Sequence, residues 1–415
     1  MTRRLSGILA AGALAVLAGR PARAELDALG TAFVTGGATS NPLLAPAAAA
    51  PSWDEFTTVR ATLRGRALGP RTEQLLSYTY AGTFYVETTD ANAQVHDLAW
   101  LLTATPTGRT DLRAGAGATY GTLNSINPLA ATAGSNLQNV AVAGFTTVPG
   151  GAVTYLGANA NANGFYRPDG VTTWGELTNV TAFVPVKGDA GRSLAALQSG
   201  HYEHLWGRNA LTVDLMGTYF KSNSFTLANG TTLTGTETLQ VQGMAGWRHE
   251  YSPALYLAAS AGVLLNDTVA GPGVLGVQPV AFATIHYQTP LALAELTVTQ
   301  SSQLNVYLGQ PLLVDGAVGR VAFPIDRLER FKLIGVGTAE REWTISPSVD
   351  AALDLLAADV GVAFTPLQHP FYASVDYTTQ QQIGHTAGGI AYPSLHRQIV
   401  MLTLSASWGT DPAMR

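Results

Sequence analysis

The stretch RQIVMLTLSASW, residues 397–408, alternates between two kinds of side chain. One series is apolar and ends on an aromatic ring, while the other becomes small and polar toward its end. Successive side chains of a β-strand point to opposite faces, so the stretch predicts a strand with one apolar face. Strands of soluble sandwiches show the same alternation, so the rest of the chain has to decide between the two. The apolar series is Val400, Leu402, Leu404, Ala406 and Trp408.

The same theme repeats along the chain, as segments of alternation separated by clusters of turn residues. Tight connections such as 106–109 and 252–253 alternate with longer ones rich in Gly, Asn, Thr and Ser. This asymmetry is typical of membrane barrels with short periplasmic turns and long outer loops. Strands are predicted to begin near Leu29, Glu55, Thr72, Gln94, Asp111, Gln138, Val171, Ser193, Asn209, Thr236, Ala254, Val274, Leu291, Leu312, Glu329, Ser348, Phe371 and Arg397.

The predicted fold is therefore all-β: a transmembrane antiparallel up-and-down β-barrel of about 18 strands, within a range of 14–18. Three places are ambiguous, and one of them is 325–338. Residues 121–170 form a long loop that holds an extra hairpin or a plug, and residues 151–158 could be a strand of it. The apolar parity also changes within 353–364, which predicts a β-bulge.

Residues 1–24 are typical of a secretory signal. Arg3 and Arg4 provide a positive start, residues 5–19 form an apolar run, and residues 22–24 offer a small-x-small cleavage site. The run is too short for a membrane anchor, which needs about 20 apolar residues. We expect cleavage before Glu25, a single barrel over 25–408 and a C-terminal tail over 409–415.

The composition favours a membrane barrel over a soluble domain. Only 12% of the residues are charged, which is about half the usual share, and the chain has 44 glycines and no cysteine. An exported chain of this length does not need disulfides to be stable. The net charge of -5 comes without a basic patch, so a nucleic-acid partner is not expected.

Several predicted strands assign their faces clearly. In 210–220, Leu211, Val213 and Leu215 face lipid and Asp214 faces the lumen, and 254–265 likewise turns its odd-numbered apolar residues outward. Around Asp350, the residues expected outside are Val349, Ala351, Leu353 and Leu355. Aromatic residues expected near strand ends, as interfacial girdles, are Trp53, Tyr85, Trp174, Trp206, Tyr219, Phe220, Trp247, Tyr251, Tyr287, Trp343 and Trp408.

Charged residues on the inner parity are the candidates for lining a pore. Arg60, Arg64 and Arg66 share one face of a strand, and Arg113 follows a few strands later. The acidic candidates come from later strands: Asp214, Glu295, Asp350, Asp354 and Asp376. Opposed arcs of unlike charge would create a field across the lumen, and internal salt bridges bracing the wall are the equal alternative.

No constellation in the sequence predicts an enzyme, a cofactor or a metal site. In the cluster 201–204, His201 and Glu203 share a strand face while His204 points the other way, so the three cannot converge on one ion. The remaining histidines are scattered, and no nucleophile elbow, metalloprotease or nucleotide-binding motif is present.

The closing strand ending on Trp408 resembles the last strand of Gram-negative outer-membrane proteins, although residues 409–415 follow the aromatic. Over its whole length the chain resembles an outer-membrane porin. Its low charge is also similar to barrel components of exopolysaccharide secretion systems, including those of myxobacteria. The resemblance implies a place in the outer membrane and contact with its lipid and with the barrel assembly machinery. It also implies polysaccharide and secretion-system components as partners.

The sequence thus predicts an outer-membrane channel for hydrophilic solutes, with polysaccharide export as its finer form. One alternative is a plugged or structural barrel acting as a receptor or adhesin, with residues 125–170 as the plug. A barrel hydrolase is the less favoured alternative, because its serine or aspartate would need a partnered histidine at the rim.

Purified in detergent, the mature protein should begin after residue 24, be almost entirely β, and run at different gel mobilities before and after heating. Mass spectrometry and circular dichroism measure the first two properties. Extraction from the periplasm in soluble form without detergent would contradict the membrane assignment.

Overall fold

The computed structural model describes residues 25–42, 53–123, 153–188, 191–226, 232–233, 235–269, 276–305, 310–328, 330–344, 352–365, 371–385 and 394–409. Predicted features in residues 1–24, 124–152 and 410–415 lie outside this description. Within the described ranges, no helix is long and apolar enough to cross a membrane.

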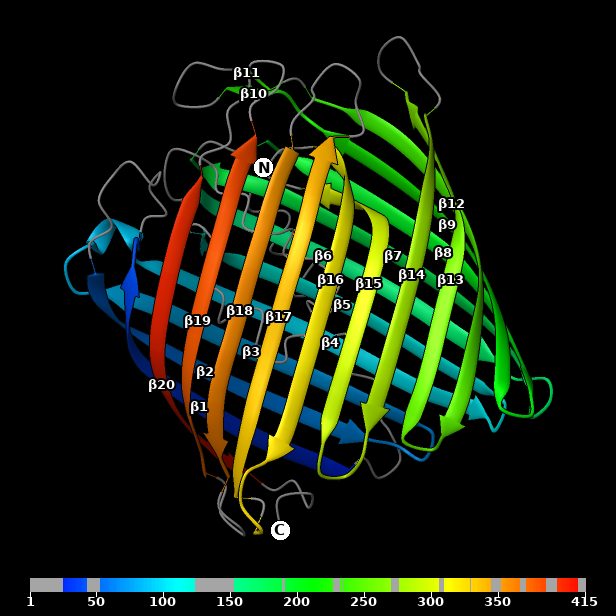
Figure 1. Cartoon of the computed structure of the whole chain (residues 1–415), viewed down its shortest axis with the longest axis horizontal. Helices are drawn as coiled ribbons and strands as arrows, with labels where there is room; N and C mark the ends of the chain where they lie inside the picture. Colours follow the sequence, from blue (N-terminus) through cyan, green and yellow to red (C-terminus); the bar gives the residue numbers. More distant parts are fainter. Residues whose placement is uncertain are drawn as a thin grey trace.

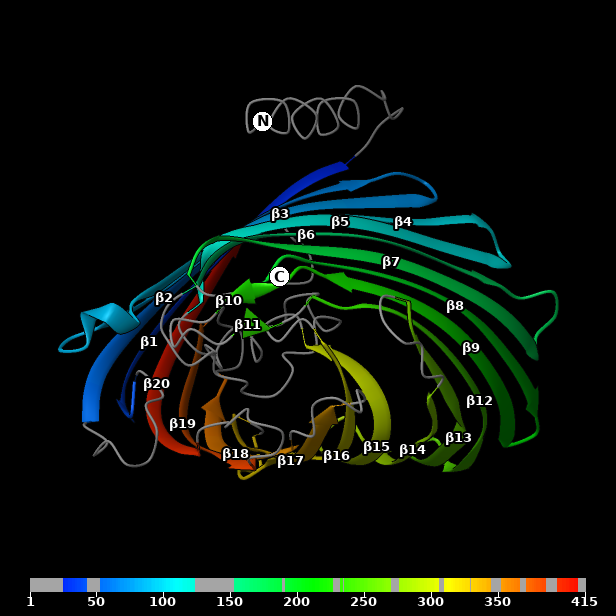
Figure 2. The ribbon, with the colours of Figure 1, turned by 90° about the horizontal axis from the view of Figure 1, so that it is seen from above.

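Eighteen antiparallel strands form one closed sheet, which Figure 1 shows from the side and Figure 2 from above. Each strand pairs with its neighbours along the chain, and β1 pairs with β20 to close the ring. This confirms the predicted antiparallel up-and-down barrel. The wall consists of β1 (Glu25–Ser40), β2 (Trp53–Leu68), β3 (Thr72–Tyr85), β4 (Ala93–Thr107), β5 (Thr110–Leu123), β6 (Val153–Tyr166), β7 (Thr172–Lys187), β8 (Ser193–Trp206), β9 (Asn209–Ser222), β12 (Glu237–Ser252), β13 (Leu255–Thr268), β14 (Gly276–Gln288), β15 (Leu293–Asn305), β16 (Gln310–Pro324), β17 (Phe331–Thr344), β18 (Ala352–Phe364), β19 (Phe371–His385) and β20 (Leu395–Gly409).

Small elements outside the wall accompany the long connections. The two-residue strands β10 (Phe225–Thr226) and β11 (Thr232–Leu233) pair with each other between β9 and β12, and the short 3-10 helix η1 (Thr89–Ala91) lies between β3 and β4. The strand predicted near Gln138 lies outside the described residues. The wall strand of that region is β6, so 153–166 belongs to the wall and not to a plug.

The two ends of the barrel differ in their connections. Short turns lie at the end where β1 starts and β20 finishes, called the lower end here and drawn at the bottom of Figure 1. Gly207 adopts a φ of 60° in the two-residue turn between β8 and β9, a conformation that glycine permits. In another lower turn, hydrogen bonds from the backbone N–H groups of Val171 and Thr172 lower the pKa of Asp169. Short turns mark the periplasmic side, so the long connections of the upper end face outward from the cell.

The seam between the first and last strands closes the sheet. β1 and β20 pair from Leu29↔Gly409 to Thr39↔Ile399, and the hydroxyls of Thr35 and Thr403 share a hydrogen bond of 2.9 Å inside the barrel. On the outside, the Trp408 ring covers Gly30 so closely that a Cβ there would overlap it. Glycine thus leaves the space that the aromatic side chain fills across the seam.

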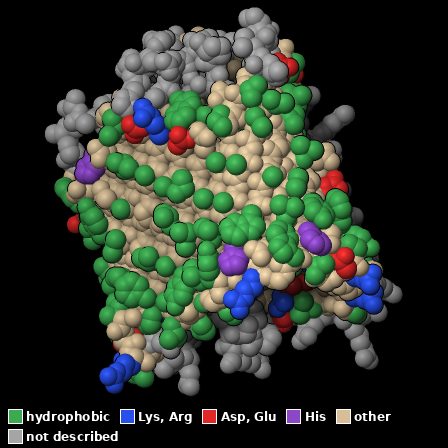
Figure 3. Space-filling view, turned by 45° about the vertical axis from the view of Figure 1, so that its right-hand side comes forward, with side chains coloured by type: hydrophobic (Ala, Val, Ile, Leu, Met, Phe, Trp, Pro, Cys, Tyr) green, Lys and Arg blue, Asp and Glu red, His purple; other side chains and the backbone are tan. Residues whose placement is uncertain are grey.

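The outer face is apolar through its middle. The outward residues predicted in 210–220 and 254–265 are confirmed, with Leu215 60% exposed and Val263 48% exposed, as is the apolar series of β20. Figure 3 shows hydrophobic side chains over the middle of one face and most charged ones toward its edges. Near the lower edge, Trp174 packs on Tyr202 with ring centroids 4.7 Å apart. Trp206 and Trp247 lie at the same end of their strands.

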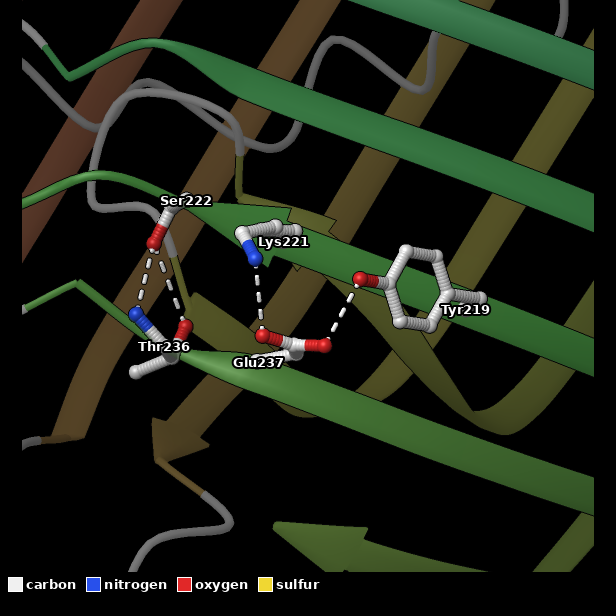
Figure 4. Close-up of polar contacts among 5 residues, drawn as sticks. All are labelled: Tyr219, Lys221, Ser222, Thr236 and Glu237. Atoms are coloured by element: carbon white, nitrogen blue, oxygen red, sulfur yellow. Dashed lines mark hydrogen bonds and ion pairs between the residues drawn. The ribbon is translucent and has the colours of Figure 1, made fainter. Parts of the chain in front are cut away.

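The height of this apolar band can be estimated along β12. At its upper limit Lys221 contacts Glu237 at 2.9 Å, and the Tyr219 hydroxyl donates to the same carboxylate at 2.8 Å, as Figure 4 shows. Trp247 follows Glu237 by ten residues. At about 3.3 Å per residue and a tilt of about 40°, the two lie about 25 Å apart in height, which matches the apolar band of outer-membrane barrels. The protein is an outer-membrane β-barrel.

Two pairs of polar side chains lie on the lipid side of the wall. Gln198 on β8 donates to the carboxylate of Glu176 on β7 at 3.1 Å, and the Tyr78 hydroxyl contacts Nδ1 of His96 at 2.7 Å. A hydrogen-bonded partner reduces the cost of placing a polar group against hydrocarbon.

Strand β18 corrects the predicted phase shift. It pairs with β17 and β19 without a bulge, and it turns Leu356, Val360 and Val362 outward. Leu353 and Leu355 therefore face inward and are 3% and 2% exposed. The prediction assigned Leu353 and Leu355 to the lipid face because they are apolar, whereas the upper interior also buries apolar residues. Among the expected girdle residues, Tyr85 and Phe220 are wrong for the same reason, since both lie on the inner face.

Changing Leu215 to Arg should impair assembly far more than changing Asp214 to Asn. The first change puts a cation on the lipid face, at a cost of about 2–4 kcal/mol near the midplane, and the second alters a wet lumen. Heat-modifiable folded protein in outer-membrane fractions is the measurement. Equal tolerance at the two positions would mean that the faces of β9 are reversed.

Candidate functional site

The inner face of the wall receives most of the charged residues singled out in the sequence. Their parity is opposite to that of exposed outward residues on the same strands, such as Leu63 on β2 and Val375 on β19. Asp354 is a correction: it lies on the outer parity of β18, 3.5 Å from Arg341. Asp350 lies outside the described residues. The structure places on the inner face Arg60, Arg64, Arg66, Arg113, Asp214, Glu295 and Asp376.

The three arginines of β2 differ in their surroundings. Arg66 donates through Nε to Glu73 on β3 at 2.7 Å. The Nε atom of Arg60 is buried without an acceptor among the described residues, and Asp97 of β4 lies on the same inner wall. Arg64 is exposed and makes no ion pair within the described part of the chain. Of these three arginines, Arg64 therefore has the least compensated positive charge.

The inner acids have partners on their own strands or on the next strand. Asp214 contacts Nδ1 of His201 at 2.7 Å, and Glu295 contacts His286 at 2.9 Å. Asp376 accepts from the Ser374 hydroxyl at 2.6 Å. The contacts of Asp214 and Glu295 join neighbouring strands, as expected if these charges brace the wall.

The order of the strands bears on the other interpretation, in which a basic arc and an acidic arc face each other across the lumen. Only β20 and β1 separate β19 from β2, so Asp376 lies on the same side of the barrel as the arginines. Asp214 on β9 and Glu295 on β15 lie far around the ring from β2. Among the predicted residues, the unlike charges that face each other across the lumen are therefore the arginines of β2 and these two paired acids.

A row of neutral amides lines the inner face of β6 and β7. Asn159, Asn161 and Asn163 alternate with outward alanines on β6, and Asn179 on β7 pairs in register with Asn161. We call these four residues the amide arc. The Oδ1 atoms of Asn163 and Asn179 are buried and have no hydrogen-bond partner among the described residues. The repeat ANANANG, residues 158–164, carries this signal in the sequence, but it lies in the stretch 121–170 predicted as a long loop with an extra hairpin or a plug.

The surroundings of the amide arc are flat, with aromatic rings at both ends. Gly115 and Gly117 of β5 pair with Asn161 and Asn159, and the Asn161 amide lies 3.1 Å from the position of a Cβ on Gly115. Toward the upper end, Tyr155 stacks on Phe183 with centroids 5.2 Å apart. Phe165 lies on the inner face at the lower end. Amides both donate and accept hydrogen bonds, and aromatic faces accept the apolar faces of sugars.

The histidine cluster lies as strand alternation predicts. His201 and Glu203 face the lumen, and His204 faces outward. Glu203 contacts Arg248 of β12 at 3.5 Å. No group of three metal-ligating side chains occurs in the part of the chain that the structure describes.

Comparison with known proteins gives structural neighbours only. No family model matches the chain, and no curated protein matches it. The siderophore receptor PirA from Pseudomonas aeruginosa is similar at 9% identity and a TM-score of 0.47, over 94% of this chain and 81% of that one. OccK2 (OpdF) from the same organism is similar at 8% identity and 0.47, over 93% and 98%. A bacterial polysaccharide outer membrane secretin is similar at 9% identity and 0.38, over 91% and 98%.

Replacing Arg60, Arg64 and Arg66 with glutamine should weaken anion preference, with Arg64 giving the largest single effect because it is the least compensated. The measurement is the reversal potential in a planar bilayer under a salt gradient. The effect should fade between 0.1 M and 1 M salt, as the Debye length falls from about 10 Å to about 3 Å. The control is Arg341→Gln on the outer face. Unchanged selectivity of the triple variant at low salt would contradict the assignment.

Proposed function

We propose that this protein is an outer-membrane channel for hydrophilic solutes, and more specifically for neutral, hydroxylated chains such as polysaccharides. The observation that carries the proposal is the amide arc on the inner face of β6 and β7. The size and lining of the barrel support it.

The strand number supports an aqueous passage. Barrels of about 16 to 18 strands leave a water-filled channel, whereas about eight strands are filled by their own side chains. Arg64 on β2, Arg113 on β5 and Asp214 on β9 point inward, where water can solvate them. A lumen of this kind admits solutes that do not enter hydrocarbon.

The chemistry of the arc supports hydroxylated solutes. Its amides provide donors and acceptors without net charge, and two of its buried oxygens have no described partner. The glycines of β5 leave a surface without side chains next to it. A row of individually weak sites allows a chain to advance from one to the next, since conduction requires binding that is also easily released.

Arg113 adds one cation at the lower end of the arc. It pairs in register with Asn163 across β5 and β6, on the inner face. A solute that is mostly neutral but carries an occasional carboxylate or phosphate would gain a charge-assisted hydrogen bond there. The proposed substrate class therefore includes weakly anionic sugars.

The triple change of Asn159, Asn161 and Asn163 to Ala should weaken block of the ion current by soluble oligosaccharides by about tenfold or more. Each lost neutral hydrogen bond contributes about 0.5–1.5 kcal/mol. The measurement is the oligosaccharide concentration that halves single-channel current. The matched control changes Thr58, Thr62 and Thr79 to Ala, because these inner residues belong to another part of the wall.

Two outcomes would contradict the proposal. An unchanged block in the triple variant would remove the arc from the solute path. A barrel that stays silent in bilayers and in liposome swelling, even after deletion of residues 126–150, would favour the receptor or structural alternative. The deletion stops before β6 because 153–166 is part of the wall.

A further inference from the structure

The wall is incomplete between β14 and β15 at the upper end. Their pairing runs from Gln288↔Leu293 to Ala281↔Gln300 and stops there. β14 nevertheless remains paired with β13 up to Gly276, and β15 remains paired with β16 up to Asn305. The upper parts of β14 and β15 therefore separate while each keeps its other neighbour.

Pro279 explains where the pairing stops. The bond from Gln288 N–H to the Ala254 carbonyl shows that even-numbered residues of β14 bond to β13, so odd-numbered residues bond toward β15. In the register of the lower part, Pro279 would lie opposite Ser302. Proline has no N–H to donate, which confines it to strand edges. The ladder thus ends next to a residue that cannot continue it.

The separated part of β15 bends into the barrel. Ser302 exchanges two hydrogen bonds with Gln240, which faces the lumen from β12: Nε2 donates to Oγ at 3.0 Å, and Oγ donates to Oε1 at 3.1 Å. β12 lies beyond β13 and β14 from β15. Figure 2 shows the yellow upper ends of β15 and β16 reaching inward from the wall.

Burial on both faces of β16 gives independent evidence. In its lower part the outward residues Val321 and Phe323 are 42% and 43% exposed, as a lipid-facing wall requires. In its upper part Leu313, of the same parity, is 2% exposed, and Val314 of the opposite parity is 1% exposed. A strand covered on both faces lies inside the barrel and not between lipid and lumen.

The wall behind the bent strands is covered as well. Leu264 on β13 and Val280 on β14 face the lumen and are 0% and 1% exposed. Gln240 also donates to Asn266 of β13 at 3.1 Å. The inner wall that Ser302 reaches at Gln240 is thus buried at Leu264 and Val280 as well.

We propose that the upper parts of β15 and β16, residues 301–305 and 310–315, form a flap that narrows the lumen and is latched to β12 by Gln240 and Ser302. The flap is joined to the wall through β17 and through the lower part of β15, while its edge toward β14 is free. Two neutral hydrogen bonds latch it, in addition to the burial of Leu313, so their release lets it swing back more readily and widen the passage. This proposal rests on the proposed channel function only for its effect on transport.

The position of the flap is tested by crosslinking, and the chain has no cysteine of its own. Gln240→Cys with Ser302→Cys should be joined by a short, reducible bis-methanethiosulfonate reagent, which makes up for the lost length of glutamine. The control pair, Thr58→Cys with Thr83→Cys, joins adjacent wall strands whose hydroxyls lie 2.9 Å apart. Gel mobility without heating is the readout. Crosslinking of the control pair alone would overturn the proposal.

The movement of the flap is tested by labelling a residue that it covers. Val280→Cys should react slowly with a charged maleimide, and several-fold faster when Ser302→Ala removes the latch. Ser260→Cys, on the inner face of β13 below the flap, is the control and should react equally in both backgrounds. Equal labelling of Val280→Cys with and without the latch would overturn the proposal. This readout does not depend on conduction, so it separates failure of the flap from failure of the proposed function.

The effect on transport is read in the crosslinked protein. Current through the Gln240→Cys and Ser302→Cys pair should rise several-fold when reductant opens the crosslink, and current through the control pair should not change. In a conducting barrel, equal currents before and after reduction would show that the flap does not narrow the path and would overturn that part of the proposal.

Discussion

The rest of this structure depends on the need to pair every backbone N–H and C=O group that lies in hydrocarbon. No water is available there, so a sheet can cross a membrane only if it has no open edge. β1 and β20 meet this requirement by pairing over eleven register positions, from Leu29↔Gly409 to Thr39↔Ile399. Once the ring is closed, strand alternation divides all side chains between lipid and lumen. The low charge, the outer apolar band and the inward arginines follow from that division.

The seam between β14 and β15 shows how such a wall tolerates an interruption. Pro279 has no N–H group, so one backbone donor that would lack a partner on β15 is absent. The upper parts of β15 and β16 leave the wall and are buried on the inner side of the barrel. Irregular backbone at membrane depth is stable where protein or lumen water covers it. The interruption therefore leaves fewer unpaired groups than a simple gap would, and it brings Ser302 to Gln240.

Strand number and most strand faces could be predicted because they depend on local alternation and turn residues. Arg60, Arg64 and Arg66 were assigned to the lumen from parity alone. Their partners could not be predicted, because the sequence of one strand does not determine its register with the next strand. The ion pair of Arg66 with Glu73 is therefore visible only in the structure. The face of Asp354 was predicted wrongly because its neighbours Leu353 and Leu355 were expected to face lipid. Both are instead buried on the inner face of the barrel. The amide arc was missed because alternation is usually recognised from large apolar side chains, and a strand of alanine, asparagine and glycine has none.

The closing contact between the first and last strands also constrains how the molecule folds. Thr35 and Thr403 touch across 368 positions of chain, so the contact that completes the ring spans nearly the entire length of the polypeptide. Contacts of such separation form slowly because the loop entropy is lost before they stabilise anything. Until then the sheet has two edge strands with unpaired N–H and C=O groups, and each of them can pair wrongly with another chain. A nascent copy therefore passes through a long aggregation-prone interval, and a catalyst that holds one edge while the last strand arrives would shorten it most.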